Sequence, residues 1–162
     1  MDERVFVVNA SPLIFLAHID GLALLSRLSV KVVVPSAVLK EVFAGDDLHP
    51  SLRQVESASW LSVEPDVLLP VEIAGWDLGS GESQVLAVAS LNAGCEAVLD
   101  DLQARRCARS LGIATTGTLG IVLRAKKAGL IPAARPLVEE LLQTRMYLSR
   151  ALAESALADV GE

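Results

Sequence analysis

The chain has 162 residues, of which 52% are hydrophobic and only 4% aromatic, and its formal net charge is −6. This length and composition predict a single domain over residues 1–162, with a core built mainly from aliphatic side chains. The acidic balance argues against a protein that holds nucleic acid mainly through a broad basic surface, although it leaves room for a local basic patch.

Two cysteines, Cys95 and Cys107, are too few for a disulfide framework or a metal cluster. The chain opens without a charged leader that runs into an apolar segment and a cleavage site. Its apolar runs are broken well short of the length that spans a bilayer, so we expect no contact with a membrane. Together these features predict a reduced, cytoplasmic setting.

Short β-branched runs alternate with helix-like segments along the chain. We predict strands at residues 5–8, 30–34, 98–99 and 113–115, with a weaker fifth candidate at 60–63. We predict helices at 11–18, 21–28, 36–44, 81–93, 101–110, 117–129, 136–144 and 149–159, and loops at 46–50 and 65–79. This alternation predicts an α/β fold, a three-layer α/β/α sandwich around a short, mainly parallel sheet. The helices within 136–159 could pack on this domain or on a partner.

The first chemical signal is the run Asn9-Ala10-Ser11-Pro12, directly after the first predicted strand. The first strand of such a sheet is usually central, so polar residues at its carboxyl end face the crevice where ligands bind. Asn9 and Ser11 are therefore candidate site residues. A simpler alternative is that both only cap the following helix, with Pro12 in its first turn.

Glu41 is a second candidate, because of its place on the predicted helix 36–44. At about 100° per residue it falls between Ala37 and Val38, inside the apolar arc of that helix. We therefore expect a carboxylate on the buried side, which needs a cation, a metal or a hydrogen-bond donor as its partner. The alternative is a solvated residue at the edge of the arc.

Glu82 heads the apolar stripe of the next long helix, three and four residues before Val85 and Leu86. As an alternative, it is simply an acidic residue in the first helical turn, where the helix dipole favours negative charge. A capping box that starts at Ser80 would need its acid at position 83, where Ser83 stands, so that box does not explain Glu82.

Asp100 and Asp101 stand side by side at the end of a predicted strand. Either one could cap the following helix, but capping does not easily explain both. Together with Asn9, Glu41 and Glu82 they would form an all-oxygen pocket suited to Mg²⁺ or Mn²⁺. A hard cation held by carboxylates points to phosphoryl-transfer chemistry.

Two further segments could assist such a site. Arg105 brings positive charge close to the paired aspartates, either toward a phosphate or as a partner that relieves their repulsion. Thr116-Gly117-Thr118 follows a strand and opens a helix, so its backbone N–H groups could receive a phosphate. The alternative, which we favour, is a tight turn that needs glycine for its backbone. Neither histidine, His18 or His49, has zinc-ligand spacing with the cysteines.

Five short motifs occur in order along nearly the whole chain. They occupy Asn9 to Ile14, Pro35 to Glu41, Gly79 to Ser83, Leu99 to Arg105 and Thr116 to Gly120. In this order they resemble the PIN-domain ribonucleases, in particular the branch of VapC-like toxin relatives. The resemblance implies a PIN fold and a ribonuclease that cleaves single-stranded RNA with Mg²⁺ or Mn²⁺. It also implies a small antitoxin protein as partner, and a homodimer.

Residue by residue, the resemblance assigns roles to these positions. The metal site would comprise Asn9, Glu41, Glu82, Asp100 and Asp101, of which the four carboxylates would be catalytic. Ser11, Arg105, Thr116 and Thr118 would contact substrate or support the metal ligands. Most PIN nucleases carry aspartate where this chain has Asn9, and the amide removes one negative charge from the site.

Two other functions compete with the ribonuclease. One is a catalytically weak or silent PIN scaffold that binds a protein partner, which the net charge and Asn9 favour and the remaining carboxylates oppose. The other is a phosphate-accepting receiver domain, which also has paired acids on a parallel sheet. A receiver needs those acids near its first strand, whereas Asp100 and Asp101 follow a late strand.

Overall fold

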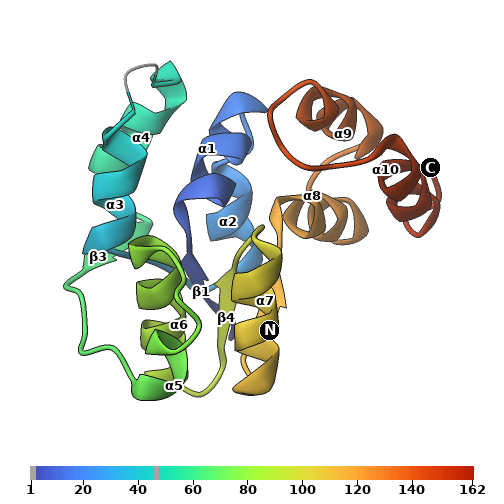
Figure 1. Ribbon diagram of the computed structural model, residues 1–162. Coiled ribbons are helices and arrows are strands. Elements are labelled where there is room, and N and C mark those ends of the chain that lie inside the picture. Colours follow the sequence, from blue (N-terminus) through green and yellow to red (C-terminus); the bar gives the residue numbers. More distant parts are fainter. Residues whose placement is uncertain (1–2, 46–47) are drawn as a thin grey trace.

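The computed structural model describes residues 3–45 and 48–162, and Figure 1 shows its ribbon. Its sheet is fully parallel, in the order β3-β2-β1-β4-β5, so the first strand is central. The strands are β1 (Val5–Val8), β2 (Lys31–Pro35), β3 (Leu61–Glu64), β4 (Cys95–Val98) and β5 (Ala114–Thr116). Two edge strands of three and four residues limit the exposed backbone at the rims.

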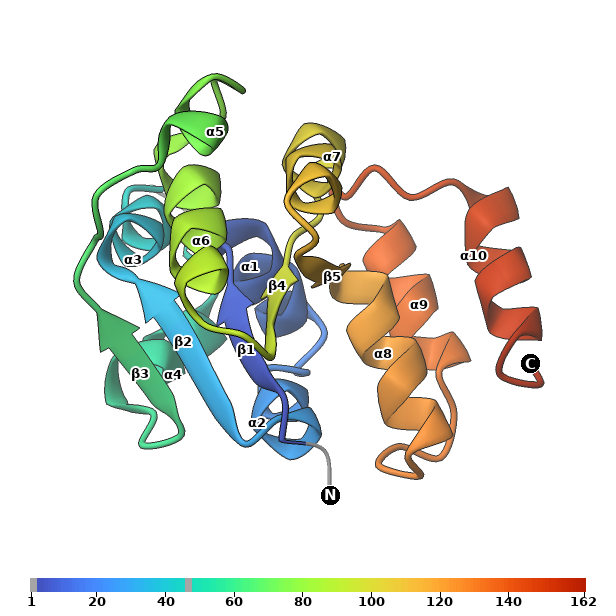
Figure 2. The ribbon, with the colours of Figure 1, turned by 90° about the horizontal axis from the view of Figure 1, so that it is seen from below.

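Helices cover both faces of the sheet, which gives the predicted α/β/α sandwich. The main helices are α1 (Ala10–His18), α2 (Ala23–Leu28), α3 (Ser36–Phe43), α6 (Ser80–Leu91), α7 (Leu102–Ser110), α8 (Thr118–Lys127), α9 (Arg135–Leu142) and α10 (Arg150–Ala158). Figures 1 and 2 show α1, α2 and α8 on one side of the sheet and α6 and α7 on the other. Among the described residues, no helix is long and apolar enough to cross a membrane.

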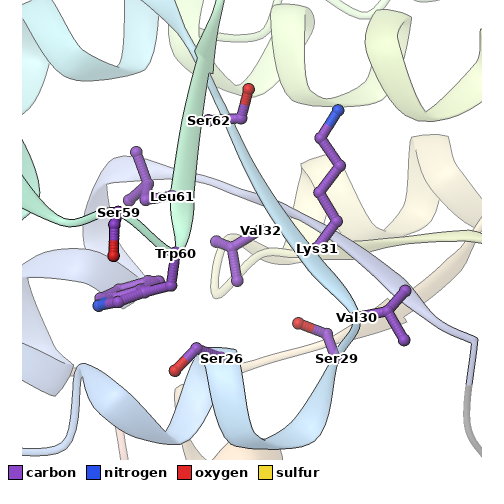
Figure 3. Close-up of a pocket in the computed structure, with 9 residues that line it drawn as sticks. All are labelled: Ser26, Ser29, Val30, Lys31, Val32, Ser59, Trp60, Leu61 and Ser62. Atoms are coloured by element: carbon purple, nitrogen blue, oxygen red, sulfur yellow. The ribbon is translucent and has the colours of Figure 1, made fainter.

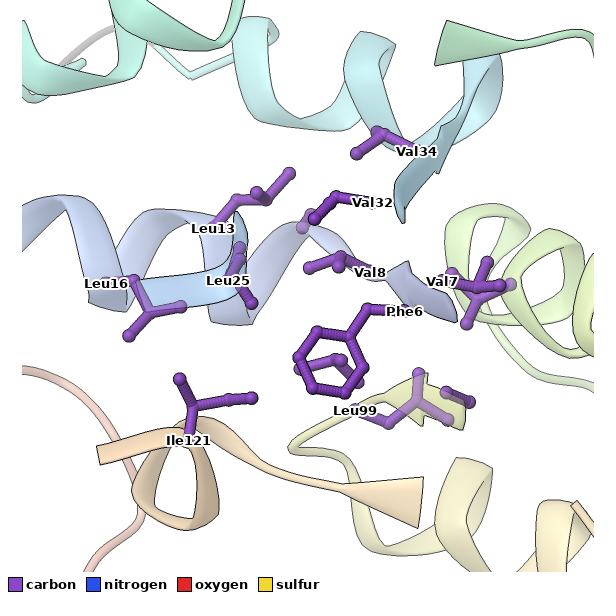
Figure 4. Close-up of a cluster of buried hydrophobic side chains, with 14 of the residues drawn as sticks. Phe6, Val7, Val8, Leu13, Leu16, Leu25, Val32, Val34, Leu99 and Ile121 are labelled. Carbon is purple, nitrogen blue, oxygen red and sulfur yellow. The ribbon is translucent and has the colours of Figure 1, made fainter. Parts of the chain in front are cut away.

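The core lies on both faces of the central strands. Phe6, Val7 and Val8 of β1 are all completely buried, and Figure 4 shows Phe6 beside Leu99 with Ile121 nearby. Leu13 and Leu16 of α1 close the same cluster from the helical side. A strand buried on both faces reads as a continuous apolar run, and this is why the β-branched run at 5–8 identified β1.

The sequence missed three short elements and misplaced one strand. Residues 48–50, the described part of the first predicted loop, lead into a 3₁₀ turn (Pro50–Leu52) and α4 (Arg53–Ser57), while Asp46 and Asp47 lie outside the described residues. The second predicted loop contains α5 (Val71–Ala74). Helices of four or five residues are too short to show a 3.6-residue period. β4 begins at Cys95, earlier than the predicted 98–99. The prediction missed its first residues because polar Glu96 interrupts their apolar pattern.

On the outside of the sandwich α9 packs against α8 and α10 packs against α9, and Figure 2 shows α10 as the outermost element. Ser149 caps α10, because its Oγ accepts the Leu152 N–H at 3.1 Å. We expect Ser149→Ala to lower the free energy of unfolding by about 1 kcal/mol, the usual loss for a removed helix cap. Urea unfolding monitored by circular dichroism measures this change. Ser155→Ala on the same helix is the control, and equal losses in both variants would contradict the capping role.

Candidate functional site at the carboxyl ends of β1 and β4

The order of the strands creates one special position in the sheet. From β1 the chain moves first toward β2 and β3, and later to the other side toward β4 and β5. The connections therefore leave in opposite directions at the carboxyl ends of β1 and β4, which is where open α/β sheets bind ligands. Asn9 follows β1 directly, and its N–H donates to the Val98 carbonyl at the end of β4 (3.1 Å). Asp100 follows Val98 by two residues, on the same edge.

Asn9 does not cap α1, although it occupies the capping position. Its side chain makes no capping hydrogen bond, and only 4% of its surface is exposed. Within residues 3–45 and 48–162, its Oδ1 is the buried side-chain polar atom without a hydrogen-bond partner. An unpaired buried acceptor costs about 1–3 kcal/mol. The capping explanation for Asn9 is therefore wrong, and its oxygen has a lone pair directed to no protein donor. Ser11 lies half-buried in the first turn of α1.

The paired aspartates have two different environments. Asp101 caps α7, because its Oδ1 accepts the Ala104 N–H at 2.8 Å. Asp100 instead binds the start of α8: Oδ1 accepts the Thr118 N–H and Oδ2 accepts the Thr118 hydroxyl, both at 2.7 Å. The capping alternative thus holds for one member of the pair only. Thr118 is fully buried and fixes the orientation of the Asp100 carboxylate.

Position 117 requires glycine because a side chain would not fit there, and not because of an unusual backbone conformation. Its φ of −110° is open to any residue, so the predicted turn requirement is wrong. A Cβ there would lie 2.9 Å from Asp100 Oδ1 and 3.2 Å from Arg105 Nη1. Thr118 N–H already donates to Asp100, so it is not a vacant phosphate donor. Buried Thr116 is likewise packed closely, since a Cβ on Gly120 would overlap its Oγ1.

Glu41 sits at the exposed end of α3, so the expected burial of its carboxylate is wrong. The helical wheel placed Glu41 correctly beside the apolar face of α3, but the Glu41 side chain itself is exposed to solvent. Its Oε1 accepts the Gly81 N–H in the first turn of α6 at 2.8 Å. A Cβ on Gly81 would lie 2.6 Å from Glu41 Oε2. Glycine at this position therefore leaves room for the Glu41 carboxylate of α3 to bind the first turn of α6.

Glu82 does take part in a capping interaction, one residue earlier than the sequence indicated. α6 is capped from Gly79, and Glu82 Oε2 accepts the Gly79 N–H at 3.0 Å. The prediction that a capping box does not explain Glu82 is therefore wrong. The sequence reasoning assumed Ser80 as cap, whereas Ser80 is the first residue of the helix. Capping leaves the second carboxylate oxygen of Glu82 without a bond in that box.

Burial and neighbouring groups shift the pKa values of two carboxylates at this edge, Glu82 and Asp100. Burial raises the pKa of Glu82, the Gly79 N–H lowers it, and the negative charges of Asp101 and Glu41 raise it further. Burial also raises the pKa of Asp100, against the lowering effects of the Thr118 hydrogen bonds and the Arg105 charge. A cation beside Glu82 would offset the repulsion that Asp101 and Glu41 exert on it. Glu82 is thus close enough to these two acids to be affected by their charges, whereas the causes of the Asp100 shift include no other carboxylate.

These raised pKa values predict a specific pH dependence. A group whose pKa is higher in the folded protein contributes stability that is present at low pH and lost as pH rises through the folded value. Above the ordinary values of 3.8 for Asp100 and 4.5 for Glu82, the metal-free protein should therefore lose stability from both groups. Urea unfolding of wild type and of the variant Asp100→Asn/Glu82→Gln between pH 4 and pH 8 measures the difference. A wild-type loss no steeper than that of the variant would contradict this cause.

The donor set fits a hard divalent cation. Each of the four carboxylates accepts a backbone N–H at a helix N-terminus, which stabilises its charge without a metal. In the described part of the chain, no three His, Cys, Asp or Glu side chains are close enough to hold a metal ion as they stand. Even so, the unpaired Asn9 oxygen lies at the edge that the acids share, and oxygen ligands are those that Mg²⁺ and Mn²⁺ prefer.

Other polar features of the molecule lie away from this edge. Figure 3 shows a cavity of about 440 Å³ lined by Trp60, Lys31 and several serines at the amino end of β2, opposite the carboxylates. Lys31 there pairs with Glu64 at 2.8 Å. Glu96 is a buried acid that the sequence did not single out, and its carboxylate binds Arg124 at 2.6 and 2.8 Å and Arg4 at 3.2 Å. Because it is well paired, we interpret Glu96 as structural.

Fold and site together define an α/β protein with an amide and several carboxylates at the switch point of a parallel sheet. A family model described as a PIN domain matches residues 5–162. The match spans nearly the whole chain, so the protein belongs to the PIN-domain family, as the motifs predicted. No curated protein matches the sequence significantly. PIN domains are generally nucleases and typically bind divalent metals. The relation to VapC-like toxins stays a prediction.

Proposed function

We propose that this protein is an endoribonuclease that uses Mg²⁺ or Mn²⁺ to cleave single-stranded RNA. The observation that carries the proposal is the buried, unpartnered Oδ1 of Asn9 at the switch point, on the same edge as Asp100 and as Glu82, whose pKa is raised by the charges of Asp101 and Glu41. A protein that stores an unpaired acceptor and like charges at one place loses stability there. A bound cation would offset this loss of stability, and this favours a metal-binding role for the arrangement.

Asn9 and Asp100 would hold the ion at the ends of β1 and β4. Glu41, Glu82 and Asp101 would add negative charge around it and complete its ligands. When bound, the cation would activate water and offset the charge of the phosphodiester. The exposed position of Glu41 leaves its carboxylate free to turn toward a ligand at little cost in packing.

The remaining predicted residues would support this chemistry. Thr118 holds the Asp100 carboxylate in one orientation through two hydrogen bonds. Arg105 lines the same cavity as Asp100 and Asp101, where its charge would contact a phosphate of the substrate. Ser11 in the first turn of α1 and Thr116 at the end of β5 would orient substrate or metal ligands.

We further propose that the protein is the toxin of a toxin–antitoxin pair and forms a homodimer. Exposed apolar side chains favour protein partners: Leu68, Val71 and Trp76 stand in solvent on and beside α5. We place this activity in the cytoplasm, where RNA is present and where Cys95 and Cys107, both free thiols, would stay reduced. Sedimentation of the isolated protein, with and without the protein encoded beside it, tests both assemblies.

The activity is tested by incubating the protein with a mixed pool of single-stranded RNA in Mn²⁺ and in EDTA. We expect cleavage in Mn²⁺ only, and much weaker cleavage by Glu41→Gln and Glu82→Gln. Calorimetric titration of Mn²⁺ into the same proteins runs in parallel. If the wild type neither binds Mn²⁺ nor cleaves RNA, the ribonuclease proposal fails and the protein-binding scaffold takes its place.

A further inference from the structure

A groove continues from the acidic edge toward the C-terminal helices. Its volume is about 760 Å³, within the range of about 300–1,000 Å³ that is usual for small-ligand sites. Asp100, Asp101 and Arg105 line one part of it, and Leu102, Tyr147 and Leu152 line another. The far wall comes from the connection between α9 and α10, which passes beside α8 (Figure 1).

The apolar part of this groove is unusually open. The Tyr147 side chain is completely exposed, and more than half of the surface of Leu102 and of Leu152 is exposed as well. By contrast, the neighbours Met146 and Leu148 are partly buried and pack on the core, so they anchor the segment that carries Tyr147. An anchored segment that presents an aromatic ring to solvent is suited to stacking against a flat ligand.

We propose that this groove binds one unpaired nucleotide of the RNA strand, with its base stacked on Tyr147. This inference rests on the proposed ribonuclease function, because the groove shares Asp100 and Asp101 with the site. The chemistry along the groove follows that of a nucleotide. The Arg105 charge suits a phosphate, the partly exposed Thr115 suits a sugar, and the apolar rim suits a base.

The groove therefore fits a nucleotide better than an apolar protein segment. Arg105 offers this groove a positive charge that a phosphate would use and an apolar protein segment would not. α7 also carries Arg105, Arg106 and Arg109 within nine residues, a local basic stretch in an acidic chain. Of these arginines Arg105 lines the groove, and its charge gives an RNA backbone a local attraction that the overall charge of −6 does not.

The test measures equilibrium binding of a fluorescein-labelled single-stranded RNA to the full chain in EDTA, so that metal-dependent cleavage does not shorten the probe. We expect Tyr147→Ala to weaken binding about 5- to 150-fold, which corresponds to about 1–3 kcal/mol for one stacked base. Tyr147→Phe keeps the ring and should bind within about twofold of wild type. Leu91→Ala removes an exposed apolar side chain outside the groove, at the end of α6, and should not change RNA affinity.

A probe with a single abasic position, moved along the strand, identifies the base. At one position the missing base should weaken binding to wild type and have no further effect on Tyr147→Ala. Unchanged RNA affinity in Tyr147→Ala would overturn the inference. If that variant then altered the sedimentation of the protein instead, the groove would be a protein interface. Cleavage of RNA without any dependence on Tyr147 refutes the groove alone and leaves the ribonuclease standing, whereas a wild type that neither binds RNA in EDTA nor cleaves it in Mn²⁺ refutes both.

Discussion

Asn9→Asp should lower the free energy of unfolding of the metal-free protein by about 3 kcal/mol at neutral pH. A carboxylate at this position would be an uncompensated charge at a nearly buried site, and such charges cost about 3–5 kcal/mol. The nearby Asp100 charge adds to the cost. The unpartnered oxygen of Asn9 is tolerated at present because the amide is neutral. Urea unfolding of both proteins in EDTA measures this loss.

Added Mn²⁺ should stabilise Asn9→Asp more than wild type, and so narrow the difference in stability between the two proteins. A ligand that binds only the folded state stabilises it by about 2.7 kcal/mol at 100 times its dissociation constant. Because the additional carboxylate would face the cation, we expect Asn9→Asp to bind Mn²⁺ about tenfold more tightly and to gain more stability from it. Asn9→Ala is the control, since it removes the oxygen without adding charge and should respond less to Mn²⁺. Equal Mn²⁺ responses in all three proteins would show that residue 9 does not face the ion.

Asp100→Asn should reduce metal-dependent RNA cleavage by about 100-fold or more, because it weakens both ligand charge and metal affinity. The same substitution should leave the metal-free fold intact. An amide at this position can still accept the Thr118 N–H and can donate to the Thr118 hydroxyl. Burial raises the pKa of Asp100, so removing its charge also relieves a cost in the folded state. Lost activity combined with preserved stability is the signature of a functional residue.

The matched control is Glu140→Gln, which makes the same change of charge at an exposed position on α9, outside the site. Cleavage rates in Mn²⁺ and unfolding in EDTA are measured for both variants. If Asp100→Asn cleaved RNA as fast as Glu140→Gln, the aspartate would not contribute to the activity. If it unfolded at much lower urea, the carboxylate would be structural, as a cap of α8 would be.

The parallel sheet and its long helices could be predicted from the sequence because their patterns are local. The β-branched runs of β1 and β2 and the apolar stripe of α6 show the periods of buried strands and of a helix. α4 and α5 were not predicted because a helix of about one turn is too short to show a hydrophobic period. Within the site, the residue types and their order along the chain were visible, and so was the convergence of acids at one edge.

What the sequence could not supply is how each acid is held. Glu41 looked buried on a helical wheel, but its carboxylate lies at an open edge and binds Gly81 of another helix. Which aspartate caps α7 and which binds Thr118 depends on the position of α8, a tertiary contact. The role of Gly117 as the space beside Asp100 has the same origin. Tyr147, which we propose to stack on a base, belongs to no motif and is far from the acids in the chain, so the sequence did not single it out.

Crystals of the protein grown with Mn²⁺ and measured at the manganese absorption edge would locate the ion by anomalous scattering. We predict an anomalous peak at the carboxyl ends of β1 and β4, with Asn9 Oδ1 and an Asp100 carboxylate oxygen among its ligands. Glu41, Glu82 or Asp101 should complete the coordination. A peak elsewhere in the molecule, or none at a saturating Mn²⁺ concentration, would contradict a metal-dependent ribonuclease site at this edge.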